Sequence, residues 1–291
     1  MLLTVFTPTY NRKELLRRVY DSLLQQTSQD FCWLIVDDGS KDCTGDEVRK
    51  WIADAEIPIQ YVYRENGGKM RAHNTGVERA TTELFICVDS DDYLAPDAVE
   101  QIVKAWEEVR ARGNQENTVA GIVAHKGKSL TETLSGSEFP RVEYSTLREL
   151  YQGGFHGETT LVFKTDILKK YPFPEINGEK YVPEDYIYDK IDRDYVLRVL
   201  PHILTICELV ESGYTDSVQK LRDENPQAWY LYYEQRVQIT PMSILKIKYI
   251  SHYLCFARCL KKKVFSESKF HPGLILLGMP GAWMLRLFGK K

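Results

Sequence analysis

Residues 84–93 read LFICVDSDDY, and this stretch is the most informative about the fold. Its first five residues are an uninterrupted apolar run, which is typical of a strand buried inside a sheet. Three carboxylates, Asp89, Asp91 and Asp92, follow at once, so we expect them where the strand emerges at the sheet edge. Like charges this close repel one another, and a hard cation such as Mg²⁺ or Mn²⁺ relieves that repulsion. A solvated acidic turn is the alternative, since Asp is common at turns.

Strands and helices alternate through the first 110 residues. Apolar strands are expected over residues 3–6, 33–36, 59–63 and 84–88, with a helix after each. Asn11, followed by Glu14 three residues later, is a capping-box pattern and predicts the start of the first helix. Such alternation implies right-handed crossovers and a mostly parallel α/β sheet, in which ligands bind beyond the carboxyl ends of the strands. The loops at those ends contain Tyr10, Asp38, Lys69 and Asp91.

The second half of the chain is less regular. Strands are expected over residues 118–124, 159–164 and 203–210, and helices over 145–151, 184–200, 226–237 and 243–263. Residues 126–141 are polar and are predicted to form a loop. The pattern predicts one α/β domain over residues 1–215, with halves 1–110 and 111–215, followed by a helical extension over residues 216–291.

Charge is distributed unevenly along the chain. The net charge is −3, but residues 240–291 carry ten basic and one acidic residue, whereas the first 239 residues carry 28 basic and 40 acidic ones. A basic tail on an acidic body indicates an anionic surface as partner, either lipid or nucleic acid. Six scattered cysteines without a CxxC pair favour reduced thiols in a cytosolic protein. The N-terminus enters a strand directly, so we expect no signal peptide.

The tail also contains an apolar stretch, residues 273–288, which Pro280 interrupts. It is too short and too interrupted to span a bilayer, which takes roughly 20 residues. A basic, apolar segment that contains Trp283 and follows the lysines at 261–263 suits the membrane interface instead. The apolar stretch favours lipid over nucleic acid as the partner. A helix docked on the domain, or a dimer contact, is the alternative.

Four motifs follow one another, each at the end of an expected strand. They are Thr7-Pro8-Thr9-Tyr10-Asn11, Asp37-Asp38-Gly39-Ser40, Asn66-Gly67-Gly68-Lys69 and the acidic motif Asp89-Ser90-Asp91-Asp92, and Pro183-Glu184-Asp185 comes later. In this order they resemble the family 2 glycosyltransferases of GT-A fold, over about residues 1–215 and most closely over 1–110. The resemblance implies a Rossmann-like domain whose first half binds a nucleotide-sugar and whose second half binds the acceptor. It also implies an inverting transferase of bacterial polysaccharide assembly.

For the donor, the resemblance implies a UDP-sugar. Asp38 would hold the uracil base, with Pro8 and Tyr10 packing nearby, although a turn or helix cap also explains an Asp at this position. Glycines at 67 and 68 let the backbone turn tightly and approach a ligand. Lys69 would then reach the diphosphate as a point charge.

The metal site is predicted at the acidic motif. By resemblance, Asp91 is the expected direct ligand of Mn²⁺ or Mg²⁺ and Asp89 the second, and Asp89 and Ser90 are also assigned to the nucleotide. The cation would bridge the donor phosphates and stabilise the diphosphate leaving group as charge develops on it.

The catalytic base is expected on the acceptor side. By resemblance, Asp185 deprotonates the acceptor hydroxyl, and Glu184 orients it or binds the acceptor. Alternatively, both acids only favour the N-terminus of a helix, where the dipole stabilises them. Combined with the basic, apolar tail, the resemblance suggests a saccharide acceptor linked to polyprenyl diphosphate. The protein is then expected in the cytoplasm, peripheral at the inner face of the cell membrane.

Two other functions agree with parts of the pattern. A nucleotidyltransferase also places a metal and a nucleotide at strand ends, but a glycine-rich basic loop is expected after its first strand, where this chain reads PTYN at residues 8–11. It would release pyrophosphate rather than UDP. A non-catalytic scaffold that binds membranes through its tail is disfavoured, because the chain retains Asp38, Lys69, Asp91 and Asp185 together.

Overall fold

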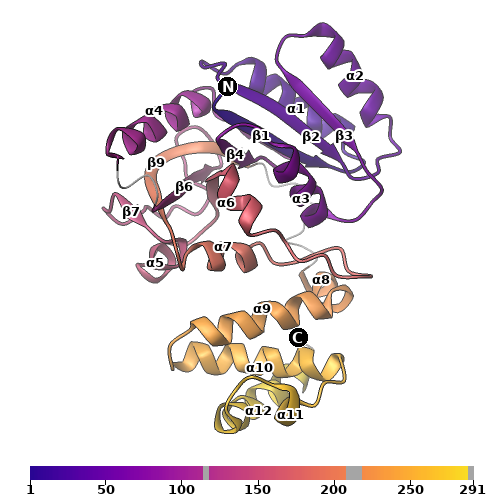
Figure 1. Cartoon of the computed structure of the whole chain (residues 1–291), viewed down its shortest axis with the longest axis vertical. Helices are drawn as coiled ribbons and strands as arrows, with labels where there is room; N and C mark the ends of the chain where they lie inside the picture. Colours follow the sequence, from indigo (N-terminus) through magenta and orange to yellow (C-terminus); the bar gives the residue numbers. More distant parts are fainter. Residues whose placement is uncertain (114–117, 208–217, 288–291) are drawn as a thin grey trace. The chain divides into compact units, whose positions relative to one another are not determined.

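The four apolar strands predicted in the first 110 residues form one half of a sheet. The computed structural model, which describes residues 1–113, 118–207 and 218–287, contains them as β1 (Leu3–Thr9), β2 (Phe31–Asp37), β3 (Ile59–Tyr63) and β4 (Leu84–Cys87). They pair in parallel in the order β3-β2-β1-β4 (Figure 1). Their carboxyl ends therefore lie at one edge of the sheet, and the predicted α/β fold is confirmed.

Helices cover both faces of these strands because side chains alternate along a strand. Val5 belongs to the apolar cluster formed with α1 (Lys13–Leu24), α2 (Thr44–Asp54) and α4 (Ala98–Ala111). Phe6 points to the other face, where its ring meets His73 of α3 (Lys69–Arg79) and stacks on Phe85. Burial on both faces explains why β1, β2 and β4 are mostly apolar, whereas β3 at the edge of the sheet is partly exposed.

The sheet is mixed beyond β4. It contains β5 (Asp92–Leu94), β6 (Val119–Gly127), β7 (Tyr144–Ser145), β8 (Thr159–Lys164) and β9 (Val196–Cys207). Strand β8 runs antiparallel to β4 and β6, β9 runs parallel to β6, and β5 pairs antiparallel with β9. The short helices α5 (Leu147–Gln152) and α6 (Thr165–Lys170) flank β8 in the sequence. Because β5 begins within the acidic motif, pairing with β9 holds the end of that motif against the sheet.

Two sequence predictions about local structure are wrong. The expected helix over residues 184–200 ends early: α7 is Asp185–Ile191, and β9 begins at Val196 because it pairs with β6. The expected strand over 203–210 is the later part of β9, and residues 208–210 lie outside the described ranges.

The predicted capping box at Asn11 is absent, since the N-cap of α1 is Arg12 and makes no side-chain capping bond. Asn11 instead has a φ of 51° and links two loops.

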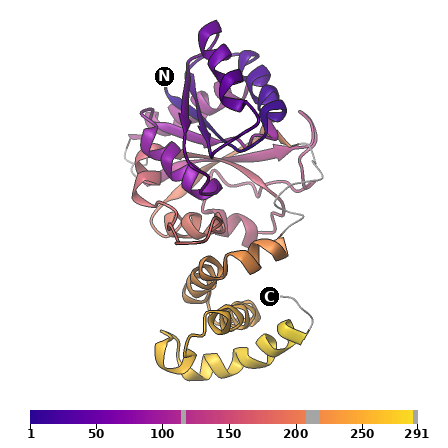
Figure 2. The same cartoon turned by 90° about the vertical axis from the view of Figure 1, so that its right-hand side faces the viewer.

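The C-terminal helices form a second unit. Residues 1–173 and 187–210 make up the first unit, and residues 174–186 and 211–291 the second. The second contains α8 (Val218–Glu224), α9 (Pro226–Ile239), α10 (Ile244–Cys259), α11 (Val264–Glu267) and α12 (Pro272–Leu287). Helix α10 packs against both α9 and α12 (Figure 2). None of the helices within the described ranges is long and apolar enough to cross a membrane.

Candidate active site

The loops after β1 and β2 are tied together by hydrogen bonds. The amide of Asp38 donates to the carbonyl of Thr9 at 2.8 Å. Asn11 completes the link, because its amide donates to Ser40 Oγ at 2.8 Å and its Oδ1 accepts from the amide of Lys41 at 2.8 Å. The left-handed backbone of Asn11 is what turns its amide and side chain toward the second loop.

Asp38 shapes the glycine loop. Its buried carboxylate accepts hydrogen bonds from the amides of Gly67, at 3.0 and 3.1 Å, and Gly68, at 2.7 Å. Arg64 forms an ion pair with it at 3.4 Å, and the side chain of Asn66 donates to the Asp38 carbonyl at 2.9 Å. These two amides lie 29 and 30 residues away in the sequence, so the carboxylate holds the glycine loop and does not cap a turn or helix of its own. The role of Asp38 in binding the base stays a prediction.

Lys69 and Asp89 form the first ion pair of the acidic motif. Lys69 is the first residue of α3, and its Nζ lies 2.8 and 2.9 Å from the two carboxylate oxygens of Asp89. Burial would raise the pKa of Asp89, but Lys69, with Lys126 and Arg12, outweighs burial and lowers that pKa. The structure thus brings together two residues that the sequence places at the ends of different strands.

Arg12 forms the second ion pair. Its Nη1 lies 2.7 Å from Asp91 Oδ2 and 3.4 Å from the hydroxyl oxygen of Ser90. Ser90 is buried, whereas the side chains of Arg12 and Asp91 are 27% and 20% exposed. The ion pair therefore borders solvent, where an incoming anion can reach the guanidinium.

Lys126 forms the third ion pair, and sequence reasoning missed it. This residue lies in β6, and its Nζ is 3.2 Å from Asp92 and 3.3 Å from Glu158. Burial would lower the pKa of Lys126, but the surrounding carboxylates outweigh burial and raise it. Burial raises the pKa of Asp92, and Lys126 opposes that shift. The sequence does show a lysine at the end of an apolar strand. Lys126 was missed because it was assigned to the predicted polar loop over residues 126–141.

Each acid of the motif thus has a basic partner from a different part of the chain. Arg12 precedes α1, Lys69 begins α3 and Lys126 belongs to β6. The described residues contain no cluster of three or more His, Cys, Asp or Glu side chains arranged to hold a metal. Two carboxylates nevertheless supply the oxygen ligands that Mg²⁺ and Mn²⁺ prefer, with phosphate oxygens and water completing the shell. The donor chemistry at Asp89 and Asp91 therefore fits such an ion bound together with a diphosphate.

Other residues lie in or next to these loops. Pro8 is buried at the end of β1, and Tyr10, one residue beyond the strand, is 46% exposed. Asn74 of α3 exchanges hydrogen bonds of 2.9 Å with the backbone of Phe173, so it holds a neighbouring chain segment. Pro8 and Tyr10 thus border the same loops as Asp38, and their contact with a nucleotide stays a prediction.

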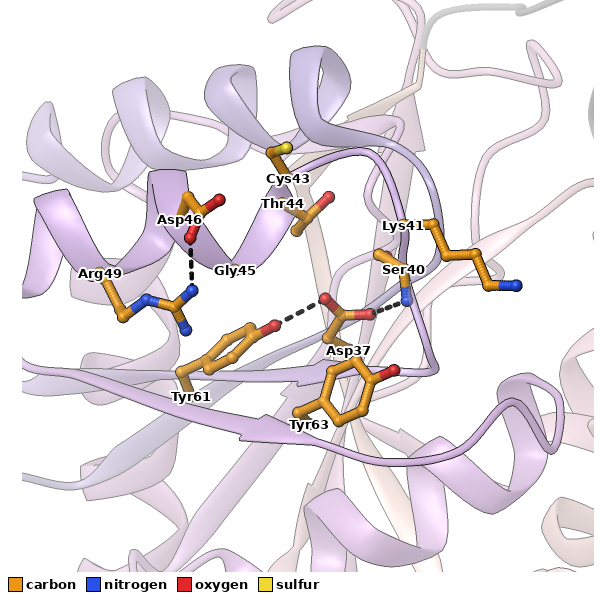
Figure 3. A pocket seen from close by; sticks show the side chains of 10 residues that line it. All are labelled: Asp37, Ser40, Lys41, Cys43, Thr44, Gly45, Asp46, Arg49, Tyr61 and Tyr63. Carbon is orange, nitrogen blue, oxygen red and sulfur yellow. Dashed lines mark hydrogen bonds and ion pairs between the residues drawn. The ribbon is translucent and has the colours of Figure 1, made fainter.

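A pocket of about 240 Å³ opens between β2, β3 and the start of α2 (Figure 3). Asp37 is at its centre, where its carboxylate accepts from Tyr61 Oη at 2.6 Å and from the amide of Ser40 at 2.7 Å. Burial and this hydrogen bond raise the pKa of Tyr61. Asp38 and the acidic motif do not line this pocket, so it is distinct from the predicted donor site.

Asp185 lies in the second unit, at the first position of α7. Its side chain is 52% exposed, and one carboxylate oxygen accepts a hydrogen bond from Arg236 Nη2 of α9 at 2.6 Å. The predicted helix start is confirmed, and the acid does occupy the first helical turn. Its partner Arg236 was not predicted, because 51 residues separate the two in the sequence.

The family model for glycosyl transferase family 2 matches residues 4–171, more than half of the chain. The chain belongs to this family. The matched region contains β1 to β4, the glycine loop and the acidic motif. The predicted family and the GT-A fold are thereby confirmed.

Several relatives have been named as glycosyltransferases. Glycosyltransferase GlyA of Streptococcus pneumoniae serotype 4 is 36% identical over 109 residues, which are 38% of this family 2 chain and 16% of GlyA. A glycosyltransferase of Rickettsia felis is 27% identical over 264 residues, covering 88% of this chain and 42% of its own length. The chain spans about half or less of the length of these curated relatives, the largest share being 53% for a Nostoc protein.

Solved structures share the fold. S. aureus TarS 1–349 in complex with UDP-GlcNAc aligns with a TM-score of 0.63 and 18% identity, covering 100% of this chain and 84% of that one. The mannosyltransferase PcManGT from Pyrobaculum calidifontis, in complex with GDP-Man and Mn²⁺, aligns with a TM-score of 0.56 and 19% identity, covering 98% and 80%. At these identities the likeness establishes the GT-A fold.

Proposed function

We propose that this family 2 enzyme transfers a sugar from a UDP-sugar to a saccharide acceptor, with inversion and with a divalent metal. The observation that carries the proposal is the acidic motif, where Lys69 and Arg12 hold Asp89 and Asp91 in ion pairs near solvent. A diphosphate is the anion that both cations suit, since Lys and Arg are the usual phosphate-binding residues. The UDP-GlcNAc complex of TarS supports a UDP-sugar as the donor.

In this proposal, donor binding exchanges the partners of the acids. Lys69 and Arg12 bind the diphosphate, and Asp89 and Asp91 would then be the residues that hold Mn²⁺ or Mg²⁺. When bound, such an ion offsets the charge that develops on the leaving diphosphate. PcManGT was solved in complex with GDP-Man and Mn²⁺, which supports a divalent metal in the proposed reaction. Asp38, Pro8 and Tyr10 are proposed to position the base, and Ser90 the nucleotide.

Asp185 is proposed as the base on the acceptor. Its carboxylate removes the proton of the acceptor hydroxyl while that oxygen bonds to the anomeric carbon. The bond between the anomeric carbon and the diphosphate breaks, and UDP leaves with the electron pair. Because the substitution is a single displacement, the anomeric configuration inverts and no glycosyl-enzyme intermediate forms.

The acceptor is proposed to be lipid-linked and met at an anionic membrane, in polysaccharide synthesis. Helix α12 supports this, because Ile275 and Gly278 pack on α10 while Leu276, Leu277 and Trp283 are 57%, 52% and 63% exposed. An exposed apolar face that follows the lysines at 261–263 in the sequence matches the chemistry of an anionic lipid surface.

Sedimentation with vesicles tests the membrane proposal. We expect binding to vesicles that contain phosphatidylglycerol, weaker binding to phosphatidylcholine alone, and a several-fold loss of binding in Trp283→Ala. Ile52→Ala, which removes an exposed apolar side chain from α2, is the matched control and leaves binding unchanged. Equal binding of the parent protein and Trp283→Ala contradicts a membrane role for α12.

Calorimetry with UDP tests the donor site. We expect UDP to bind at least ten-fold more tightly with Mn²⁺ present, and Asp91→Asn to lose that gain, because the variant keeps the size of the side chain but removes its charge. Asp21→Asn is the matched control, since it breaks an exposed Asp–Arg pair of 2.8 Å on α1. UDP binding that ignores Mn²⁺ in the parent protein overturns the metal proposal. Formation of pyrophosphate from UTP and a sugar 1-phosphate, with no UDP released from a UDP-sugar, overturns the reaction.

A further inference from the structure

The segment that leads to Asp185 is built onto helix α9. Pro226 begins this helix, and the first free amides, of Gln227 and Ala228, donate to the carboxylate of Glu179 at 2.7 and 2.8 Å. A helix leaves its first amides without partners inside the helix, and an acid at that end also interacts favourably with the helix dipole. Glu179 thus caps α9 although it lies about 50 residues away in the sequence.

Further contacts continue along the same segment. Asn225 Oδ1 accepts from the amides of Lys180 and Tyr181 at 2.8 and 3.0 Å. One turn before the end of α9, Gln235 Nε2 donates to the carbonyl of Tyr186 at 2.9 Å. Residues 179–186 are therefore fixed to α9 at both of its ends, within one unit of the structure.

The last contact reaches the acid itself. Arg236, next to Gln235, donates from Nη2 to Asp185 Oδ2 at 2.6 Å. The side chain of Arg236 is only 16% exposed, and its guanidinium lies 5.1 Å from the centre of the Tyr232 ring. Stacking on the ring restricts the guanidinium before it meets the carboxylate, so the ion pair costs less conformational entropy than a free surface pair.

We propose that Arg236 is a positioning residue for catalysis, which fixes the carboxylate of Asp185 and keeps it ionised. This inference rests on the proposed role of Asp185 as the base. It assigns the C-terminal helices a part in the reaction in addition to any contact with lipid. A carboxylate must be ionised to accept the proton of the acceptor hydroxyl, and a neighbouring guanidinium favours the ionised form.

The ion pair also fixes the orientation of the Asp185 carboxylate. Arg236 engages Oδ2 of Asp185, so the carboxylate cannot rotate freely, and we assign proton acceptance to Oδ1. When the proton arrives, Asp185 becomes neutral and Arg236 keeps its contact with the Tyr232 ring. The charged and titratable groups that face Asp185 from α9 include Arg236 and Tyr232, and Glu184 adjoins it on its own segment.

Titration of the Asp185 carboxyl by carbon NMR on protein labelled at aspartate tests this role without any acceptor. Asp185→Asn identifies the signal. We expect the titration midpoint of Asp185 to rise by about one pH unit in Arg236→Met, because an adjacent guanidinium lowers an Asp pKa by about one to three units. Arg236→Lys keeps the charge and restores most of the shift. Arg258→Met, which removes an exposed arginine from α10, leaves the midpoint unchanged.

Turnover supplies the second readout, with UDP release from UDP-GlcNAc followed against pH. We expect the acid limb in Arg236→Met to move to higher pH by the same amount, with UDP–Mn²⁺ affinity unchanged, and Arg236→Lys to recover the parent profile. If Asp185→Asn abolishes release but Arg236→Met changes neither the midpoint nor the profile, the inference is wrong and the base assignment stands. If Asp185→Asn releases UDP at the parent rate, the base assignment itself fails, and the inference fails with it.

Discussion

The Lys126→Met variant is expected to lose about 3 kcal/mol of unfolding free energy, because removing one partner of a buried ion pair costs roughly 3–5 kcal/mol. The side chains of Lys126 and Asp92 are 17% and 10% exposed, so most of that cost applies, at the lower end of the range. Glu158 adds little, since its side chain is 59% exposed and water can replace the lysine there. Methionine keeps the apolar stem, so the loss reports the missing charge.

A double-mutant cycle separates the ion pair from general damage to the fold. Asp92→Asn preserves shape, and the double variant removes both charges together. The double variant has a neutral pair of similar size and so contains no buried unpaired charge. We therefore expect it to be at least about 1 kcal/mol more stable than the sum of the two single-variant losses predicts. Lys128→Met removes a half-exposed lysine of the next loop and is expected to change stability by less than about 0.5 kcal/mol.

Urea unfolding followed by tryptophan fluorescence measures these changes, with far-UV circular dichroism as a second probe. A loss below about 1 kcal/mol in Lys126→Met, or strict additivity in the cycle, refutes the reasoning, since a cost of this size arises only when the remaining charge is buried and unpaired. Either result would mean that water reaches Asp92 and solvates it when the lysine is gone.

Three further variants test packing, titration and capping. Gly121→Ala places a Cβ against the Val162 carbonyl oxygen of the paired strand, so we expect urea unfolding to show a loss of about 2–3 kcal/mol from overpacking. Burial lowers the pKa of His252 from 6.5 to about 4. The unfolded chain therefore binds a proton near pH 6.5, whereas the native state binds one only near pH 4. As a result, the free energy of unfolding falls as the pH drops from 6.5 to about 4. His252→Gln should reduce the loss of unfolding free energy between pH 7 and pH 5 by about 1–2 kcal/mol, and an unchanged pH dependence contradicts the assignment. Glu179→Gln weakens the charged cap of α9 and should cost about 1–2 kcal/mol, read as a lower thermal midpoint.

Local pattern was enough to predict the first half of the sheet. The strands around residues 3–6 and 84–88 are mostly apolar because both of their faces are buried, and the polar residue among them, Thr4, is buried too. Turn chemistry at residues 37–40 and 66–69 marked the strand ends, since parallel strands deliver their loops to one edge. The motif order in those loops was sufficient to identify the family.

Where the hydrophobic pattern fitted both a strand and a helix, pairing within the sheet determined which one formed. Residues 196–200 were predicted as helix, but they form β9 because β6 offers an edge for them to pair with, and a short apolar run does not distinguish strand from buried helix. The capping box at Asn11 failed for a similar reason, because bonds to Ser40 and Lys41 compete for its amide and side chain.

The sequence by itself determined which acids and bases are present and which strand ends they follow. Only the tertiary structure decided their partners: Lys126 meets Asp92 across 34 residues, and Arg236 meets Asp185 across 51. Neither pair can be predicted from local sequence, because the residues around a charged side chain do not show which distant residue will pair with it. Burial makes the Lys126–Asp92 pair costly to break, whereas the Arg236–Asp185 pair forms because α9 places a largely buried guanidinium next to an exposed carboxylate. Both conditions are properties of the folded chain.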